Sequence, residues 1–282
     1  MIALEGYANM KNDAPVCIIG GYDKLSKTFY DSILRSRNNS IFINVGKYKA
    51  STKNIFNLKI FELKKIFVLL KKNQINNVVF LGKIHRPDLS AFKQDGVIDK
   101  YIPILYKSFS KGDGSILSTV IEIFRQNFYT VLSPNKISSE FFFDKNEVKH
   151  PKTQNDKGDI FKATRILNEL SKYDNAQSIV IVNGYIIAIE AAEGTDNLLK
   201  RSKKIREDLT QINKKEGVLI KIPKKKQSKL VDLPVIGPKT IRLTFKANLN
   251  GIAFNRKYTM VDNKHKTLKL ASEYNINLYD VC

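Results

Sequence analysis

Short apolar runs that alternate with amphipathic segments constrain the fold of this chain more than any other feature of its sequence. Strands that alternate with helices form parallel sheets with helices on their faces. In the first half, four apolar runs are expected to be strands: 15–19, 41–45, 77–82 and 128–133. Helices are expected between them, at 23–36, 61–72 and 115–127, and in the last two the apolar residues recur at helical spacing. The first half therefore predicts an α/β domain with a parallel sheet.

The second half repeats the alternation and adds a hairpin. A helix is expected at 159–173 and a strand at 217–222. The apolar stretch 178–192 contains two strands that meet at Asn183-Gly184, a strong hairpin signal, so this half predicts a mixed-sheet α/β domain. Residues 134–158, between the halves, are polar and aperiodic. We therefore predict an N-terminal domain at 1–135, a linker at 136–157 and a C-terminal domain at 158–282.

The net charge limits the partners of the chain. Among 282 residues, Lys and Arg total 48 and Asp and Glu total 27, which gives a formal charge of +21. This charge suits nucleic acid, an anionic membrane or a phosphorylated small molecule, although a solvated lysine-rich surface explains it equally well. No helix-turn-helix pattern or aromatic RNA-binding motif accompanies the lysines, so we expect no specific nucleic-acid partner.

Cysteine usage and the lengths of the apolar runs indicate the compartment. Cys17 and Cys282 cannot form a disulfide framework, and the three histidines are too far apart for a zinc motif. The N-terminal residues MIALEGYANMKND lack the features of a signal peptide. The stretch 178–192 is shorter than a membrane span. We therefore expect a cytoplasmic protein that is at most peripheral to a membrane.

Three loops of the first half carry candidate phosphate contacts, and each has a structural alternative. Gly20-Gly21 follows the first strand and could let backbone amides approach a phosphate, or could form a tight turn. Arg86 could bind a phosphate, or could pair with Asp88 and stiffen its loop. Asp113 precedes a helix and is either its N-cap or a contact to a ribose or a metal.

The densest group of polar residues is Glu190-Ala191-Ala192-Glu193-Gly194-Thr195-Asp196, where a strand end meets a helix start. A helix N-terminus attracts an anion, and these carboxylates could hold Mg²⁺ through oxygen ligands. The alternative is that Thr195 caps the helix and Asp196 favours its first turn. Further along, Asp232 lies among apolar residues in a cationic segment, and it is either a structural counter-charge or a site residue.

These motifs, taken in order, closely resemble one family, the LpxI-type UDP-2,3-diacylglucosamine pyrophosphatases of lipid A synthesis. The resemblance covers roughly residues 15–281, and the most specific part is EAxEGTD followed by VDLPxIG. The matching positions are the glycine turn after the first strand, Gly82…Arg86-Pro87-Asp88, Lys111-Gly112-Asp113, Gln177, Asn183-Gly184, Glu190-Ala191…Glu193-Gly194-Thr195-Asp196, Gln227, Val231-Asp232-Leu233-Pro234…Ile236-Gly237 and Thr240.

The resemblance implies two α/β domains that enclose the substrate, the first of them Rossmann-like. It implies hydrolysis of the pyrophosphate in UDP-2,3-diacylglucosamine to UMP and 2,3-diacylglucosamine 1-phosphate (lipid X). The expected cofactor is Mg²⁺ or another divalent cation. The expected place is the anionic inner face of the inner membrane, and a homodimer is compatible with the family.

The resemblance also implies roles for individual residues. Asp232 is the expected catalytic residue, and Glu190, Asp196 and Asp232 are the expected metal ligands. The expected substrate-binding residues are Gly20, Gly21, Arg86, Asp88, Gly112, Asp113, Gln177, Gly194, Thr195, Lys221, Gln227 and Thr240. The chain departs from the family pattern where Gly114 replaces an acid and Leu230 replaces an arginine. These departures motivate an alternative, a diverged protein of the same fold that binds a nucleotide sugar or lipid without turnover.

Overall fold

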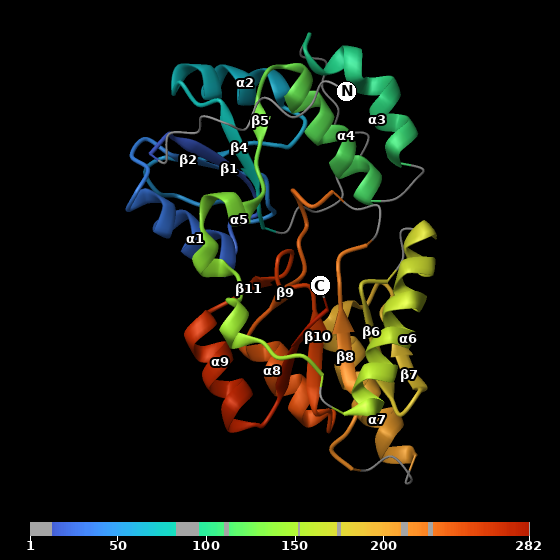
Figure 1. Cartoon of the computed structure of the whole chain (residues 1–282). Coiled ribbons are helices and arrows are strands. Elements are labelled where there is room, and N and C mark those ends of the chain that lie inside the picture. Colours follow the sequence, from blue (N-terminus) through green and yellow to red (C-terminus); the bar gives the residue numbers. More distant parts are fainter. Residues whose placement is uncertain are drawn as a thin grey trace. The chain divides into compact units, whose positions relative to one another are not determined.

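The computed structural model of the chain describes residues 13–82, 96–109, 113–151, 153–173, 176–209, 214–224 and 228–281. The chain divides into two compact units: unit 1 is Met1–Ser138 with Leu230–Asp232, and unit 2 is Ser139–Lys229 with Leu233–Cys282. Each unit is α/β, as expected, and Figure 1 draws both, with labels on the elements where there is room. Four expected site residues lie outside the described residues: Arg86, Asp88, Gly112 and Gln227.

Unit 1 contains a five-stranded sheet in the order β3-β2-β1-β4-β5. Every neighbouring pair is parallel, which confirms the predicted parallel sheet. All residues of β1 are buried, as is typical of a parallel sheet covered on both faces. The strands are β1 (Val16–Gly20), β2 (Ile41–Asn44), β3 (Ile55–Asn57), β4 (Asn77–Phe80) and β5 (Thr130–Val131).

Helices cover both faces of the sheet in unit 1. Successive strand residues project to opposite faces of a sheet. Ile41 and Ile43 share a hydrophobic core with α2, α3 and α4, whereas Phe42 contacts Tyr30 of α1. The helices are α1 (Lys24–Leu34), α2 (Leu63–Lys72), α3 (Ile102–Phe109), which follows a 3₁₀ turn at Ile98–Tyr101, α4 (Asp113–Gln126) and the short α5 (Pro134–Ile137).

Unit 2 contains a mixed five-stranded sheet in the order β12-β10-β8-β6-β7. The hairpin predicted at Asn183-Gly184 is confirmed, because β6 and β7 pair antiparallel around it. β6 is also antiparallel to β8, whereas β8, β10 and β12 are parallel. The strands are β6 (Ser178–Val182), β7 (Tyr185–Ile189), β8 (Val218–Lys221), β10 (Gly251–Phe254) and β12 (Asn277–Asp280), and β9 (Val235–Ile236) and β11 (Met260–Val261) form a separate pair.

Within the described part of unit 2, one helix covers one face of this sheet and three cover the other. Ala163 of α6 shares a core with Ile179 of β6, whereas Leu198 of α7 shares the opposite core with Val180. The helices are α6 (Gln154–Leu170), which a 3₁₀ turn at Ser171–Tyr173 extends, α7 (Gly194–Asp208), α8 (Pro238–Lys246) and α9 (Lys264–Glu273). None of the helices in the described ranges combines the length and apolar composition needed to cross a membrane.

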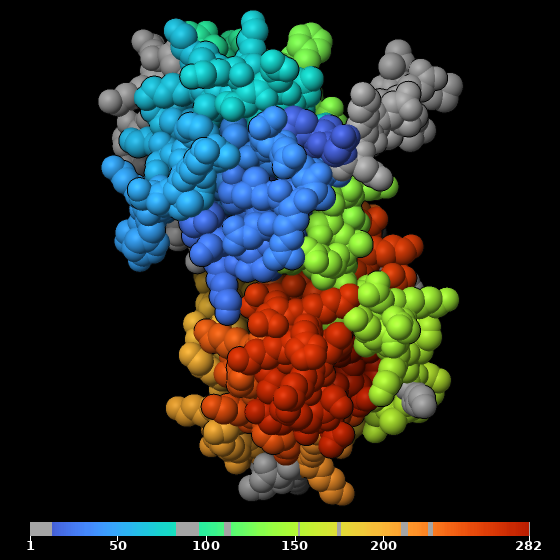
Figure 2. Space-filling model, turned by 90° about the vertical axis from the view of Figure 1, so that its left-hand side faces the viewer, coloured from blue at the N-terminus to red at the C-terminus, as the bar shows by residue number. Residues whose placement is uncertain are grey.

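The segment expected to be a linker, 136–157, is folded as part of unit 2 for much of its length. It contains 3₁₀ turns at Ser139–Phe141 and Lys145–Glu147. Phe143 is 2% exposed in the core of unit 2. The N–H and carbonyl of Lys149 both bond to β12, at 2.8 and 3.1 Å. In Figure 2 this yellow-green segment lies directly against the red C-terminal elements. A few buried aromatic residues, such as Phe143, pack this segment into unit 2, and because they do not recur at regular spacing the sequence pattern does not indicate a folded segment.

Candidate active site

An open pocket of about 340 Å³ lies in unit 2, where β8 ends and α7 and α8 begin. Lys221 is the last residue of β8, and Thr195 and Thr240 lie in the first turns of α7 and α8. The lining residues are Glu193, Gly194, Thr195, Asp196, Asn197, Lys200, Lys221, Val235, Lys239 and Thr240. Five residues expected from the sequence therefore meet here: Gly194, Thr195, Asp196, Lys221 and Thr240.

The charge of the pocket favours an anionic ligand. Lys200, Lys221 and Lys239 line it, and the N-termini of α7 and α8 add the positive ends of two helix dipoles. Glu193 and Asp196 also line the pocket, and each already pairs with a cationic side chain of the protein. The arrangement suits phosphate oxygens, because helix N-termini and ammonium groups both donate hydrogen bonds to them.

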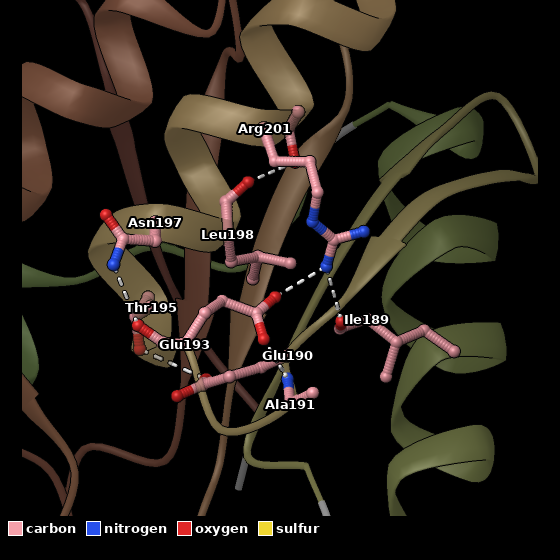
Figure 3. Close-up of polar contacts among 9 residues, drawn as sticks. Ile189, Glu190, Ala191, Glu193, Thr195, Asn197, Leu198 and Arg201 are labelled. Atoms are coloured by element: carbon pink, nitrogen blue, oxygen red, sulfur yellow. Dashed lines mark hydrogen bonds and ion pairs between the residues drawn. The ribbon is translucent and has the colours of Figure 1, made fainter.

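Hydrogen bonds of the Glu193 and Arg201 side chains stabilise the start of α7 (Figure 3). One carboxylate oxygen of Glu193 accepts from the N–H of Ala191 at 3.1 Å, and the other accepts from the Arg201 guanidinium at 2.6 Å. Arg201 also donates to the carbonyl of Ile189 at 2.9 Å. The bond from Arg201 holds the pKa of Glu193 below its usual value. Glu193 is the N-cap residue and α7 begins at Gly194, so Thr195 does not occupy the cap position.

The Thr195 side chain lies among three polar groups from neighbouring strand ends. Its hydroxyl accepts from the Lys221 ammonium at 2.5 Å and donates to the Glu190 carboxylate at 3.1 Å, and the second of these bonds is drawn in Figure 3. The Ser178 hydroxyl lies 3.3 Å away. Glu190 is therefore hydrogen-bonded to Thr195, which lines the pocket, but Glu190 is not itself one of the lining residues.

An ion pair joins the two helix starts. The Lys239 ammonium lies 2.7 Å from the Asp196 carboxylate, and this contact raises the pKa of Lys239. Thr240, in the same turn, accepts from the N–H of Gly237 at 3.3 Å, so its hydroxyl helps to cap α8. An anion that enters the pocket meets Lys239 already bound to a carboxylate of the protein.

Asp232 belongs to the short segment that packs with unit 1. Its side chain is exposed, whereas the neighbouring Val231 and Leu233 are 3% and 9% exposed. Its backbone adopts the left-handed conformation, with φ at +51°. The side chains before and after Asp232 in the sequence are buried, whereas its own carboxylate is exposed. Asp and Asn adopt the left-handed conformation more readily than other L-residues, because their short polar side chains can form local hydrogen bonds.

Gly20 and Gly21 serve close backbone packing in unit 1. A Cβ on Gly20 would lie 1.7 Å from a carbonyl oxygen just after β4, and a Cβ on Gly82 would lie 2.1 Å from the carbonyl of Gly21. The Asp23 carboxylate caps α1 by accepting a backbone N–H at 2.9 Å. A carboxylate of the chain therefore already occupies this helix start, which favours the structural alternative of a tight turn.

The remaining expected residues lie as follows. Gln177 adjoins the pocket strand, since its carbonyl accepts from the N–H of Ile222 at 3.1 Å. α4 begins at Asp113, whose side chain lies outside the described residues. Ser178 belongs to no motif of the sequence, and its position opposite Lys221 in the β6–β8 register is the signal that points to it. The sequence motifs likewise give no role to Lys200 and Lys239, which line the pocket, or to Arg201, which bonds to Glu193.

The carboxylates of unit 2 fit one mode of Mg²⁺ binding. Among the described residues, no three His, Cys, Asp or Glu side chains come together. Mg²⁺ is commonly held by one or two carboxylates together with substrate phosphates. Asp196 lines the pocket and Glu190 lies behind Thr195, and both supply oxygen donors. The residues therefore suit a cation shared with a phosphate ligand, and they do not form a closed protein cage.

Comparison with known families agrees with this architecture. The model of the LpxI N-terminal domain matches residues 15–141, and that of the LpxI C-terminal domain matches residues 145–279. The chain belongs to the LpxI family. A curated relative, the UDP-2,3-diacylglucosamine pyrophosphatase LpxI of Caulobacter vibrioides, is 30% identical over 214 residues, 75% of this chain and 76% of the relative. The resemblance drawn from the motifs is confirmed, and this LpxI family member is an enzyme of the hydrolase class.

Proposed function

We propose that this LpxI family member hydrolyses the pyrophosphate bond of UDP-2,3-diacylglucosamine, releasing UMP and 2,3-diacylglucosamine 1-phosphate (lipid X) in lipid A biosynthesis. The activity named for the Caulobacter relative supports the substrate. The observation that carries the proposal is the pocket of unit 2, where two helix N-termini and three lysines face one space. Amide and ammonium groups fixed in this way stabilise anionic oxygens, because their dipoles need no reorganisation.

In the proposed reaction, a water oxygen bonds to one phosphorus while the bridging P–O bond breaks. Phosphoryl transfer needs positioning and charge neutralisation more than covalent help from the protein. Lys221, Lys239 and the helix N-termini offset the charge on the phosphate oxygens. Asp232 is the proposed catalytic residue, whose carboxylate orients the water and accepts its proton.

The proposed cofactor is Mg²⁺ or another divalent cation, which when bound neutralises charge on the phosphate oxygens. The proposed oxygen donors in unit 2 are Glu190 and Asp196. To bind the cation, the Asp196 carboxylate has to exchange its ion pair with Lys239 for a contact with the cation. That exchange would release the Lys239 ammonium toward a phosphate oxygen, so the pair couples cation binding to anion binding.

We further propose that the enzyme is cytoplasmic and associates peripherally with the anionic inner face of the inner membrane, where a diacylated substrate resides. The net charge of +21 supports this proposal, because basic groups near an anionic lipid surface are attracted to it.

Release of UMP tests the proposed function. Purified protein is incubated with UDP-2,3-diacylglucosamine and Mg²⁺, and UMP is quantified by chromatography. We expect UMP release that is strongly reduced by EDTA and by Asp232→Asn. Binding of the substrate without UMP release would contradict the proposal, and would support the non-catalytic alternative that Gly114 and Leu230 raise.

A further inference from the structure

Four elements of unit 2 meet at one hydroxyl group, that of Thr195. Thr195 lies in the first turn of α7, and Lys221 ends β8. Ser178 begins β6, directly opposite Lys221 in the strand register, and Glu190 follows β7. The backbone N–H of Glu190 also donates to the carbonyl of Ser178 at 2.9 Å. The backbone therefore brings these four residues together.

The Thr195 hydroxyl already makes every hydrogen bond that it can make. A hydroxyl has one donor hydrogen and two acceptor positions, an ammonium only donates, and a carboxylate only accepts. The hydrogen of Thr195 therefore goes to Glu190 at 3.1 Å, and its oxygen accepts from Lys221 at 2.5 Å. Ser178, buried and 3.3 Å away, then supplies the second hydrogen that the oxygen accepts.

We infer that Thr195 is a positioning residue, which aims the Lys221 ammonium into the pocket and couples it to the Glu190 carboxylate, and that its hydroxyl does not contact the phosphate. Lys221 is then the group that meets the anion, and Glu190 is the counter-charge behind it. The inference rests on the proposed function only for the identity of that anion. It differs from the role that the family resemblance implies, in which Thr195 binds the substrate itself.

The orientation of Lys221 can be measured without any ligand. Lysines are labelled briefly with acetic anhydride, and the label on Lys221 is compared with that on Lys200 by mass spectrometry. In Thr195→Val, which replaces only the hydroxyl with a methyl group, we expect the labelling of Lys221 relative to Lys200 to change by about tenfold, the factor that corresponds to one hydrogen bond to a charged group.

Three variants accompany this measurement. Thr195→Ser keeps the hydroxyl and is expected to restore the wild-type labelling. Thr164→Val is the matched control, because the Thr164 hydroxyl has no hydrogen-bond partner in the described structure. Glu190→Gln removes the counter-charge and should change Lys221 labelling even if Thr195→Val does not fold. Unchanged labelling of Lys221 in folded Thr195→Val would overturn the inference.

A double-mutant cycle on UMP release gives the second test. Thr195→Val is expected to raise KM by about tenfold in the wild-type background. In the Lys221→Met background it should add less than about twofold, because interacting residues are non-additive. Independent, additive losses would show that Thr195 does not act through Lys221, and would overturn the inference. If the wild type releases no UMP, the proposed function fails, and the labelling result alone decides the role of Thr195.

Discussion

The left-handed backbone of Asp232, with φ at +51°, decides which substitutions isolate its carboxylate. This conformation costs an ordinary L-residue about 1–2 kcal/mol, whereas Asn and Asp visit it more readily and Gly adopts it freely. Asp232→Ala therefore combines the loss of a charge with backbone strain. Asp232→Asn keeps the size and the backbone tolerance and removes only the charge, and Asp232→Gly removes the charge and the strain together.

We expect Asp232→Asn and Asp232→Gly to lower kcat for UMP release by about 10²–10⁴-fold, the usual contribution of a general acid or base. Their stability should stay close to that of the wild type, because the exposed side chain has little packing to lose. Asp232→Ala should be equally slow and also less stable than Asp232→Asn by about 1 kcal/mol. That difference corresponds to a Tm lower by about 2–4 °C.

The assay measures UMP release at saturating substrate, together with Tm and substrate affinity on the same preparations. A folded Asp232→Asn variant with near-normal turnover would show that the carboxylate is structural. Equal melting temperatures for Asp232→Ala and Asp232→Asn would show that the surrounding fold does not impose the left-handed conformation.

Three further predictions concern stability and surface charge. Arg206 is buried and donates to four backbone carbonyls at 2.7–3.3 Å. In urea denaturation, Arg206→Met should therefore lower the free energy of unfolding by about 3–5 kcal/mol, whereas the control Lys204→Met, at an exposed position, should change it by less than about 0.5 kcal/mol. Burial raises the pKa of Asp159, so this side chain contributes fully to the free energy of unfolding below about pH 4, and its contribution is lost as the pH rises through the raised pKa. Asp159→Asn should therefore flatten the decrease of the unfolding free energy with pH, measured by unfolding curves across the acidic range, and an unchanged pH dependence would contradict this prediction. Binding to anionic vesicles should weaken steeply with salt, since each Lys or Arg near the surface contributes about 1 kcal/mol that salt screens, and salt-independent binding would point to apolar insertion.

Apolar runs predict the long strands of both units, and apolar residues at helical spacing predict the amphipathic helices. The strand expected at 41–45 is β2, the helix at 61–72 is α2, and the strand at 217–222 is β8. Weak or short elements leave no such pattern. β3 has only three residues at a sheet edge, and α6 begins before the expected residue 159 because Thr153 caps a polar first turn that carries no apolar stripe.

The sequence identifies the polar residues of the pocket but not their connections. The EGTD motif predicts a helix start, and α7 begins at its Gly194. That the Thr195 hydroxyl meets Lys221 depends on the register of β6 and β8, which no local pattern encodes. The ion pair between Asp196 and Lys239 likewise depends on how α7 packs beside α8.

The Arg201 side chain also covers part of an exposed sheet edge in unit 2. The Glu190 N–H bonds to β6, so the carbonyl of the preceding Ile189 faces outward from the edge strand β7, where Arg201 covers it. At the opposite edge, Lys149 pairs with β12. Unpaired strand edges are templates for aggregation and domain swapping. A second chain that added a strand at this end of β7 would have to displace Arg201, and would disturb the loop that starts α7. The side chain that holds the loop before α7 in place therefore also covers a backbone carbonyl of this edge strand.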